Sequence, residues 1–253
     1  SGFALNYATP AGLMGGEPYK IMELSSYVGR ERATSSVLLF SMTHIFSHFW
    51  YWFAASLLYM LLLDVSSAMF CVLLFMMFFS LCGVYLFLKG YRNGMVVKIL
   101  NALSRIPGFK NRMTRFMRTH RNELAQIDAQ IASLHTQDRR SFYVSFGLEF
   151  IGRVLQAFEI YFVLAALGVT GSFVHMFLYA TLIIALTSLF ANLLFFMPLQ
   201  LGGREGGFVM SCVQLGFTNG MGVYISIICR IRELFWTTIG LLLIKVGNRC
   251  VRN

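Results

Sequence analysis

Two short stretches of this chain repeat one arrangement of residue types, and each contains a carboxylate that could bind a ligand. In both stretches a proline precedes a Gly-Gly pair and a glutamate, and the glutamate follows the proline by seven residues. Glycine lets the backbone approach a ligand or adopt positive φ. Glu17 and Glu205 are therefore predicted to bind an amine headgroup or to couple to protons, or else to cap their own short helices. The motif consists of Asn6, Pro10, Gly15, Gly16, Glu17 and Gly29 in the first copy, and of Asn192, Pro198, Gly202, Gly203, Glu205 and Gly216 in the second.

A second set of polar residues interrupts an otherwise apolar stretch after residue 140. Glu149, Arg153, Gln156 and Glu159 fall on one face of a helix. A charge at the bilayer centre costs at least about 2.5–3.5 kcal/mol, so these side chains should face the protein interior. Glu149 and Arg153 are spaced to pair within the helix. Two interpretations stay open, a structural ion pair and the lining of a transport pathway.

The last apolar stretch contains a similar cluster near its start. Arg230 and Glu233 share a helix face at a spacing of three residues. Arginine is suited to bidentate contact with phosphate. The pattern indicates either a site for a lipid phosphate or a structural pair between Arg230 and a glutamate such as Glu205 or Glu149.

His44 and His48 are one helical turn apart, with Ser47 beside them. A third ligand for a metal is not evident in the sequence, so we interpret them as buried histidines that make hydrogen bonds. No cofactor motif is found, and no metal site is predicted from the five cysteines, which lack metal-ligand spacing.

Long stretches without charge position these residues in a membrane. The sequence is 57% apolar, with a mean hydropathy of +0.65. No Asp, Glu, Lys or Arg occurs in residues 33–63, 65–88 or 160–201. About 20 helical residues cross a hydrocarbon core of about 30 Å. We predict an all-α, polytopic bundle with spans near residues 34–63, 67–89, 141–168, 172–196 and 223–246, forming one transmembrane domain over residues 1–253.

The basic residues are concentrated in one segment. Residues 89–140 contain 11 of the 21 lysines and arginines and only three acids. This bias predicts a cytoplasmic loop over residues 90–140 under the positive-inside rule, with a short amphipathic helix inside it. The net charge of +10 is therefore not read as a sign of nucleic-acid binding.

The duplicated motif indicates how the bundle is organised. Each copy is broken by proline and glycine and leads into a long apolar helix. Paired interruptions in corresponding parts of two halves point to a transport site at a repeat interface. We therefore predict two pseudo-repeats, each with a broken or re-entrant segment.

These motifs resemble a known family. The stretch from Asn6 to Glu17, with Tyr19, Lys20 and Gly29, is similar to the first signature of the lysylphosphatidylglycerol synthase transmembrane-region family of flippase-like proteins. The stretch from Glu149 to Glu159 looks like the central helix of that family. The second signature is matched by Pro198, Gly202, Gly203, Glu205, Gly216, Arg230, Glu233 and Trp236.

The resemblance implies a flippase-like lipid translocator in the bacterial inner membrane, with further helices upstream of Ser1. In the multiple peptide resistance factor of bacteria, a similar domain moves aminoacylated phosphatidylglycerol between leaflets. The expected partners are membrane lipids, either anionic or aminoacylated phospholipids. His44 and Ser47 stand where the first repeat of the family usually has an arginine and an acid, which is a departure from its pattern.

Our leading hypothesis is lipid translocation without enzymatic activity. The alternatives are an intramembrane transferase acting on a lipid phosphate and a scaffold for an envelope-lipid enzyme. A homo-oligomer is left open, because apolar faces toward lipid and toward a second copy look alike. The predicted binding residues are Gly15, Gly16, Glu17, Lys20, Glu149, Arg153, Glu159, Gly202, Gly203, Glu205, Arg230 and Glu233.

Overall fold

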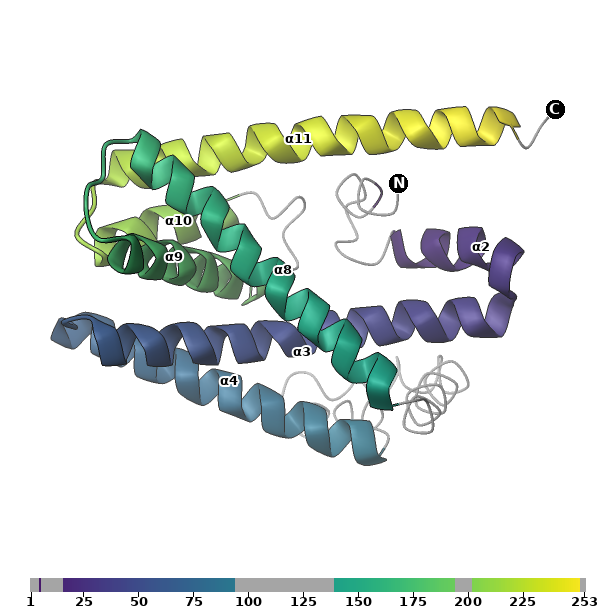
Figure 1. Cartoon of the computed structure of the whole chain (residues 1–253), viewed down its shortest axis with the longest axis horizontal. Coiled ribbons are helices and arrows are strands. Elements are labelled where there is room, and N and C mark those ends of the chain that lie inside the picture. The colour runs from purple at the N-terminus through teal and green to yellow at the C-terminus, as the bar shows by residue number, and fades with distance from the viewer. Residues whose placement is uncertain (1–4, 6–15, 94–138, 194–201, 251–253) are drawn as a thin grey trace, which may run out of the picture.

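The described part of the fold consists of long and short helices (Figure 1). The structure, a computed structural model, describes residues 5, 16–93, 139–193 and 202–250. Seven helices and no strand occur within these ranges. They are α2 (Gly16–Val28), α3 (Arg30–Leu62), α4 (Ser67–Asn93), α8 (Arg139–Ala166), α9 (Phe173–Leu193), α10 (Gly203–Gln214) and α11 (Asn219–Cys250).

The prediction of an all-α membrane protein is confirmed, and each predicted span corresponds to a helix. Three helical stretches are long and apolar enough to cross a membrane: Arg32–Leu62, Ser67–Leu88 and Phe173–Leu193. Most of the basic segment, including the predicted amphipathic helix, lies outside the described residues, as do the prolines of both motif copies.

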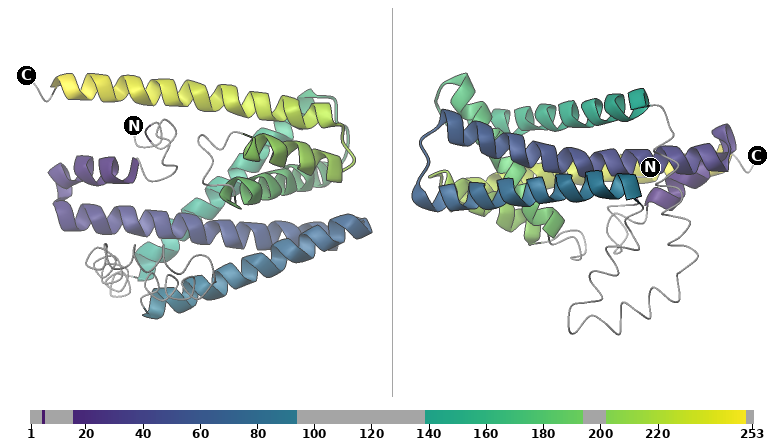
Figure 2. Two further views of the ribbon diagram at one scale, coloured as in Figure 1. Left: turned by 180° about the vertical axis from the view of Figure 1, so that it is seen from behind. Right: turned by 90° about the horizontal axis from the view of Figure 1, so that it is seen from below.

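Helix α9 forms the centre of the bundle. It packs against α3, α8 and α10, and α10 in turn packs against α11. The left view of Figure 2 shows the same order from behind, with α9 and α10 between the long helices α3 and α11. Ala180, Leu182, Ile183 and Ala185 of α9 are completely buried. Because both faces of α9 are covered, its apolar residues extend around the whole helix.

Many large apolar side chains point outward from the bundle. On α4, Phe75 and Phe78 are exposed, and on α11 Ile231, Leu234 and Phe235 are exposed. In a soluble protein, exposed apolar surface of this extent would be unusual. On helices of this length, such side chains fit contact with lipid chains.

Both copies of the duplicated motif fold in the same local order. In the first, the 13-residue α2 is followed by Gly29 and the 33-residue α3. In the second, the 12-residue α10 is followed by Gly216 and the 32-residue α11. Gly29 and Gly216 have φ of 83° and 81°, a region in which other residues are strained. This geometry explains the glycines, while the equivalence of the two halves as pseudo-repeats stays a prediction.

A close helix contact fixes α11 against α10. A Cβ atom added at Gly222 would lie 2.6 Å from Cα of Val209. Because Cα is a backbone atom, no side-chain rotation can relieve this contact. We expect Gly222→Ala to lower stability by about 1–3 kcal/mol, because overpacking forces the backbone to shift. Gly206→Ala is the matched control, since a Cβ there would meet nothing within 4 Å. Thermal unfolding in detergent, followed by size exclusion, measures the stability of both variants. Equal unfolding midpoints for Gly222→Ala and Gly206→Ala would contradict the expectation.

Candidate functional site

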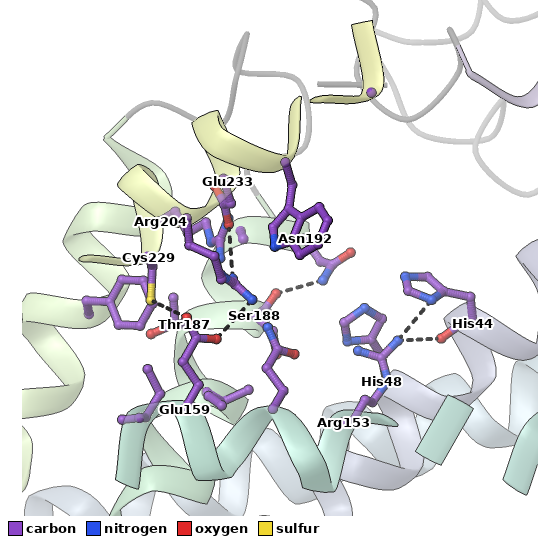
Figure 3. Close-up of a pocket in the computed structure, with 18 of the residues that line it drawn as sticks. His44, His48, Arg153, Glu159, Thr187, Ser188, Asn192, Arg204, Cys229 and Glu233 are labelled. Carbon is purple, nitrogen blue, oxygen red and sulfur yellow. Dashed lines mark hydrogen bonds and ion pairs between the residues drawn. The ribbon is translucent and has the colours of Figure 1, made fainter. Parts of the chain in front are cut away.

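A cavity of about 670 Å³ lies between α11 and the other helices around it. Residues of α3, α8, α9, α10 and α11 contribute to its wall. Figure 3 shows its polar side chains in two groups, one around Arg153 and one around Glu233. The lining residues used below are His44, His48, Arg153, Gln156, Glu159, Ile184, Thr187, Ser188, Ala191, Asn192, Arg204, Cys229, Arg232, Glu233, Trp236, Ile239 and Leu243.

The first group is centred on Arg153, which is 8% exposed. Its Nε donates to Ser47 Oγ at 2.7 Å, and its Nη2 donates to the carbonyl oxygen of His44 at 2.9 Å. Both acceptors are neutral. His44 Nδ1 lies 2.9 Å from Glu149 Oε2. Because a carboxylate supplies no proton, that nitrogen must donate to Glu149 and cannot also accept from Arg153.

The second group includes an ion pair that connects two helices. Arg232 Nη1 of α11 lies 2.9 Å from Glu159 Oε2 of α8. Cys229 Sγ lies 3.9 Å from the other oxygen of Glu159. The cavity therefore has a charged bridge between α8 and α11.

Glu233 joins three arginines in the same group. Its Oε1 pairs with Arg204 Nη1 and lies 3.7 Å from Arg232 Nη2. Its Oε2 lies 3.6 Å from Arg230 Nη1, which is beyond hydrogen-bond distance. Arg230 Nη2 in turn lies 2.6 Å from Glu205 Oε1. Alternating charges thus connect α10 to α11 along one side of the cavity.

Several buried polar atoms at this cavity have no hydrogen-bond partner among the described residues. They are His48 Nδ1, Thr187 Oγ1, Arg232 Nε and Glu233 Oε2. Buried polar groups in proteins are nearly always hydrogen-bonded. Their concentration around one cavity marks the part of the described structure that is best suited to a polar ligand.

Three of the predicted binding residues line the cavity, namely Arg153, Glu159 and Glu233. Glu149 and Arg230 stand behind its lining as partners of the lining residues His44 and Glu233, and Glu205 pairs with Arg230. The expected pairing of Glu149 with Arg153 is wrong, because each takes a partner on α3 instead. The hydrogen bond predicted for His44 is confirmed, although its side chain is 39% exposed and not buried. For His48 the prediction is not confirmed, because its Nδ1 has no hydrogen-bond partner among the described residues.

The described residues of the first motif copy are not part of this cavity lining. Glu17 Oε1 pairs with Lys20 Nζ at 2.8 Å, and its Oε2 accepts from Ser41 Oγ at 3.0 Å. Gly16 is the first residue of α2, while Gly15 lies outside the described residues. A role of Glu17 and Lys20 in lipid binding stays a prediction.

The second copy surrounds the start of α10. Gly202 precedes this helix and Gly203 is its first residue. The amide of Gly202 donates to Glu205 Oε2 at 2.8 Å, so the capping role that we considered for this glutamate is confirmed. A role of these three residues in lipid binding stays a prediction.

Several residues of the cavity lining were not predicted from the sequence as binding residues. Arg204 and Arg232 each neighbour a predicted residue in the chain, and Asn192 opens the second motif copy. Gln156 was noticed only as part of the polar stripe on its helix. Within the described residues, no group of three His, Cys, Asp or Glu side chains could hold a metal ion.

Comparison with known families decides the relationship of the chain. A family model described as the lysylphosphatidylglycerol synthase TM region matches residues 1–240. The chain belongs to this family. Neither the curated proteins nor the solved structures gave a significant match. As a member of the lysylphosphatidylglycerol synthase TM-region family, the chain is an integral membrane protein linked to lipid handling.

The capping role of Glu205 leads to a stability prediction for this family member. We expect Glu205→Gln to lower stability by about 1–2 kcal/mol, because it removes the charge that holds Arg230 and caps α10. Glu23→Gln on the exposed face of α2 makes the same charge change without such partners and should be nearly neutral. Thermal unfolding in detergent compares them, and an unchanged midpoint for Glu205→Gln would contradict the capping role.

Proposed function

We propose that this protein moves a phospholipid or isoprenoid lipid between the leaflets of a bacterial inner membrane. One observation carries the proposal: a cavity among apolar helices is lined by the buried Arg153, whose hydrogen-bond acceptors are neutral. A guanidinium group is suited to bidentate contact with phosphate. The headgroup phosphate would bind Arg153 from the cavity side.

The apolar part of the cavity lining supports a lipid as the ligand. Apolar side chains of α9 and α11 line the cavity beside the polar ones: Ile184, Ala191, Trp236, Ile239 and Leu243. Such a lining suits the start of an acyl or isoprenoid chain. A polar headgroup and an apolar chain can therefore occupy the same cavity.

The lengths of the charged helices support a multi-pass arrangement. The 28 residues of α8 and the 32 of α11 correspond to about 42 and 48 Å, longer than the hydrocarbon core. Their charged residues Glu159, Arg232 and Glu233 face the cavity, as intramembrane charges should. We therefore include α8 and α11 among the membrane-crossing helices.

The transferase alternative receives less support from the side chains. A general base needs a carboxylate that is free to accept a proton. Both glutamates of the cavity lining, Glu159 and Glu233, are ion-paired with arginines. No contact in the described part of the chain favours the scaffold alternative over translocation.

A reconstitution experiment tests the proposal. The purified protein is placed in liposomes that contain a trace of phospholipid with a fluorophore on its acyl chain. A membrane-impermeant reductant then quenches the fluorophore in the outer leaflet. We expect quenching beyond the outer-leaflet half in vesicles with protein, and quenching that stops at half in protein-free vesicles.

The quenching assay is repeated with several labelled lipids, because the transported lipid is not known in advance. Anionic phospholipids, zwitterionic phospholipids and an isoprenoid phosphate are compared, with and without a proton gradient. Quenching that stops at half under all these conditions would overturn the translocation proposal. Chemical conversion of a radiolabelled lipid by the same preparation would instead favour the transferase.

A further inference from the structure

The described charges around the cavity balance one another. Glu149 is not part of the lining, but it binds the lining residue His44. With it, the charged residues at the cavity are three arginines and three glutamates: Arg153, Arg204, Arg232, Glu149, Glu159 and Glu233. Net charge therefore favours neither an anionic nor a cationic ligand, and the uncharged polar residues of the lining become informative.

Two side-chain amides lie between the charged groups of the cavity. Gln156 is three residues from Arg153 and three from Glu159 on α8, a distance along the helix of about 4.5 Å in each direction. In Figure 3, Asn192 of α9 lies between the residues around Glu233 and those around Arg153. Both amides line the cavity. They come from different helices, so a ligand between the charged groups meets an amide on two sides.

These amides retain hydrogen-bonding capacity. The Gln156 side chain makes no hydrogen bond with another described residue. Asn192 Nδ2 donates to the carbonyl oxygen of Ser188 at 2.7 Å, which leaves its second N–H and its Oδ1 without a described partner. Each amide presents an N–H donor and an oxygen acceptor side by side. The middle of the cavity therefore offers both donors and acceptors.

Two other uncharged side chains of the lining have a buried polar atom without a partner among the described residues. These atoms are His48 Nδ1 of α3 and Thr187 Oγ1 of α9. A hydroxyl can donate and accept, and a neutral imidazole nitrogen does one or the other according to its tautomer. Because buried polar groups are nearly always hydrogen-bonded, these two atoms are a second indication of a polar ligand beside them.

The mixture of donors and acceptors indicates which chemical group fits. A phosphate oxygen without a proton only accepts hydrogen bonds, and an ammonium group only donates them. A hydroxyl group does both, so two hydroxyls on adjacent carbons can pair with the oxygen and the N–H of one amide. Such a diol would satisfy both kinds of atom, whereas either ionic group would leave one kind unpaired.

We propose that the cavity recognises a lipid headgroup with hydroxyls on adjacent carbons, such as a glycerol or a sugar, through Gln156 and Asn192. This inference rests on the proposed lipid-binding function and specifies the class of headgroup. In a phospholipid, the phosphate binds Arg153 and the hydroxyls lie further along α8 at Gln156. Recognition depends on the hydroxyls and not on the net charge of the headgroup.

Binding is tested with two pairs of lipids that differ in hydroxyls but not in charge. Phosphatidylglycerol is compared with phosphatidylpropanol, which has an anionic phosphate and a three-carbon headgroup without hydroxyls. Monoglucosyl diacylglycerol is compared with its O-methylated analogue, and both are uncharged. Each lipid carries the same photoreactive acyl chain and is present in trace amounts in phosphatidylcholine nanodiscs containing the full chain. Mass spectrometry measures crosslinking to peptides of α9 and α11 that line the cavity.

We expect the hydroxylated lipid of at least one pair to crosslink at least about tenfold more than its analogue, because the analogue leaves the amides unpaired. A preference within the phospholipid pair alone would support the proposal and assign the hydroxyls to a glycerol headgroup. A preference within the glycolipid pair alone would support it and assign them to a sugar. Equal crosslinking within both pairs would overturn it.

Substitutions of glutamine locate the recognition. Gln156→Leu replaces the amide with an apolar group of similar size and should remove most of the preference. Gln156→Asn keeps an amide on a shorter side chain and should retain part of it. Gln214→Leu makes the same change at the exposed end of α10, outside the cavity lining, and should leave the preference unchanged. An unchanged preference in Gln156→Leu would overturn the role of Gln156.

The outcomes separate this inference from the proposed function. Equal crosslinking within both pairs by the unmodified protein would overturn diol recognition even if the liposome assay shows translocation. Selective crosslinking without translocation would support diol recognition and overturn the proposed function. Absence of cavity crosslinking by all four lipids would overturn both. Because the unmodified protein decides these cases, a variant that fails to fold does not remove the test.

Discussion

Replacing Arg153 with glutamine is expected to slow lipid translocation at least about tenfold. Arg153 is 8% exposed, and its guanidinium group donates only to neutral acceptors, Ser47 Oγ and the carbonyl of His44. Hydrogen bonds to charged groups contribute about 1.5–3 kcal/mol, which corresponds to about tenfold or more. Glutamine keeps an N–H donor but lacks both the positive charge and the planar guanidinium group, which can make two parallel hydrogen bonds to a phosphate. The liposome quenching assay measures the rate.

Two further variants define what the result means. Arg153→Lys retains the positive charge but lacks the planar guanidinium group. Its translocation rate should therefore lie between those of the unmodified protein and Arg153→Gln. Arg32→Gln removes a positive charge at an exposed position on α3 and should translocate normally. A normal rate for Arg153→Gln, in protein with an unchanged melting temperature, would exclude Arg153 as the headgroup site.

The largest expected effect on stability comes from Glu233→Ala, at about 3–5 kcal/mol. Glu233 is 6% exposed and is shared by Arg204, Arg230 and Arg232. Its removal leaves these guanidinium groups close together without their common counter-charge. Thermal unfolding in detergent, followed by loss of the monodisperse peak on size exclusion, measures the effect.

A double substitution checks that charge, and not lost packing, is the cause. Arg204→Met combined with Glu233→Ala removes one of the stranded positive charges, so the double variant should be more stable than Glu233→Ala alone. Glu23→Ala on the exposed face of α2 serves as the control for a neutralised glutamate. Equal stability of Glu23→Ala and Glu233→Ala would contradict the assigned role of Glu233.

The helices were predictable because their signals are local in the sequence. Charge-free stretches identify α3, α4 and α9, and the regular spacing of Glu149, Arg153 and Glu159 places these residues on one face of α8. Gly29 and Gly216 mark the ends of short helices because positive φ favours glycine. Each of these inferences depends on a few neighbouring residues only.

The side-chain partners were less predictable, because they depend on how distant helices cross. Glu149 is four residues from Arg153, yet it binds His44, which is 105 positions away and comes close only where α3 packs against α8. Arg204 and Glu205 are adjacent, but Arg204 lines the cavity and Glu205 does not. That distinction depends on the orientation of α10 against α11, which no local pattern in the sequence determines.

The two sides of α11 are attached by different sets of contacts. Toward α10, the close approach at Gly222 brings two backbones together, in addition to the Arg204–Glu233 and Arg230–Glu205 ion pairs. Toward α8, the charged bridge is the Arg232–Glu159 pair, whose side chains are 38% and 23% exposed. Part-exposed ion pairs contribute only about 0–1 kcal/mol and weaken as dissolved ions screen them. A rise in the ionic strength of the adjoining water should therefore loosen the α8 side of α11 more than the α10 side, where the backbone contact does not depend on charge and the Arg204–Glu233 pair is more buried. This difference makes α10 the natural pivot.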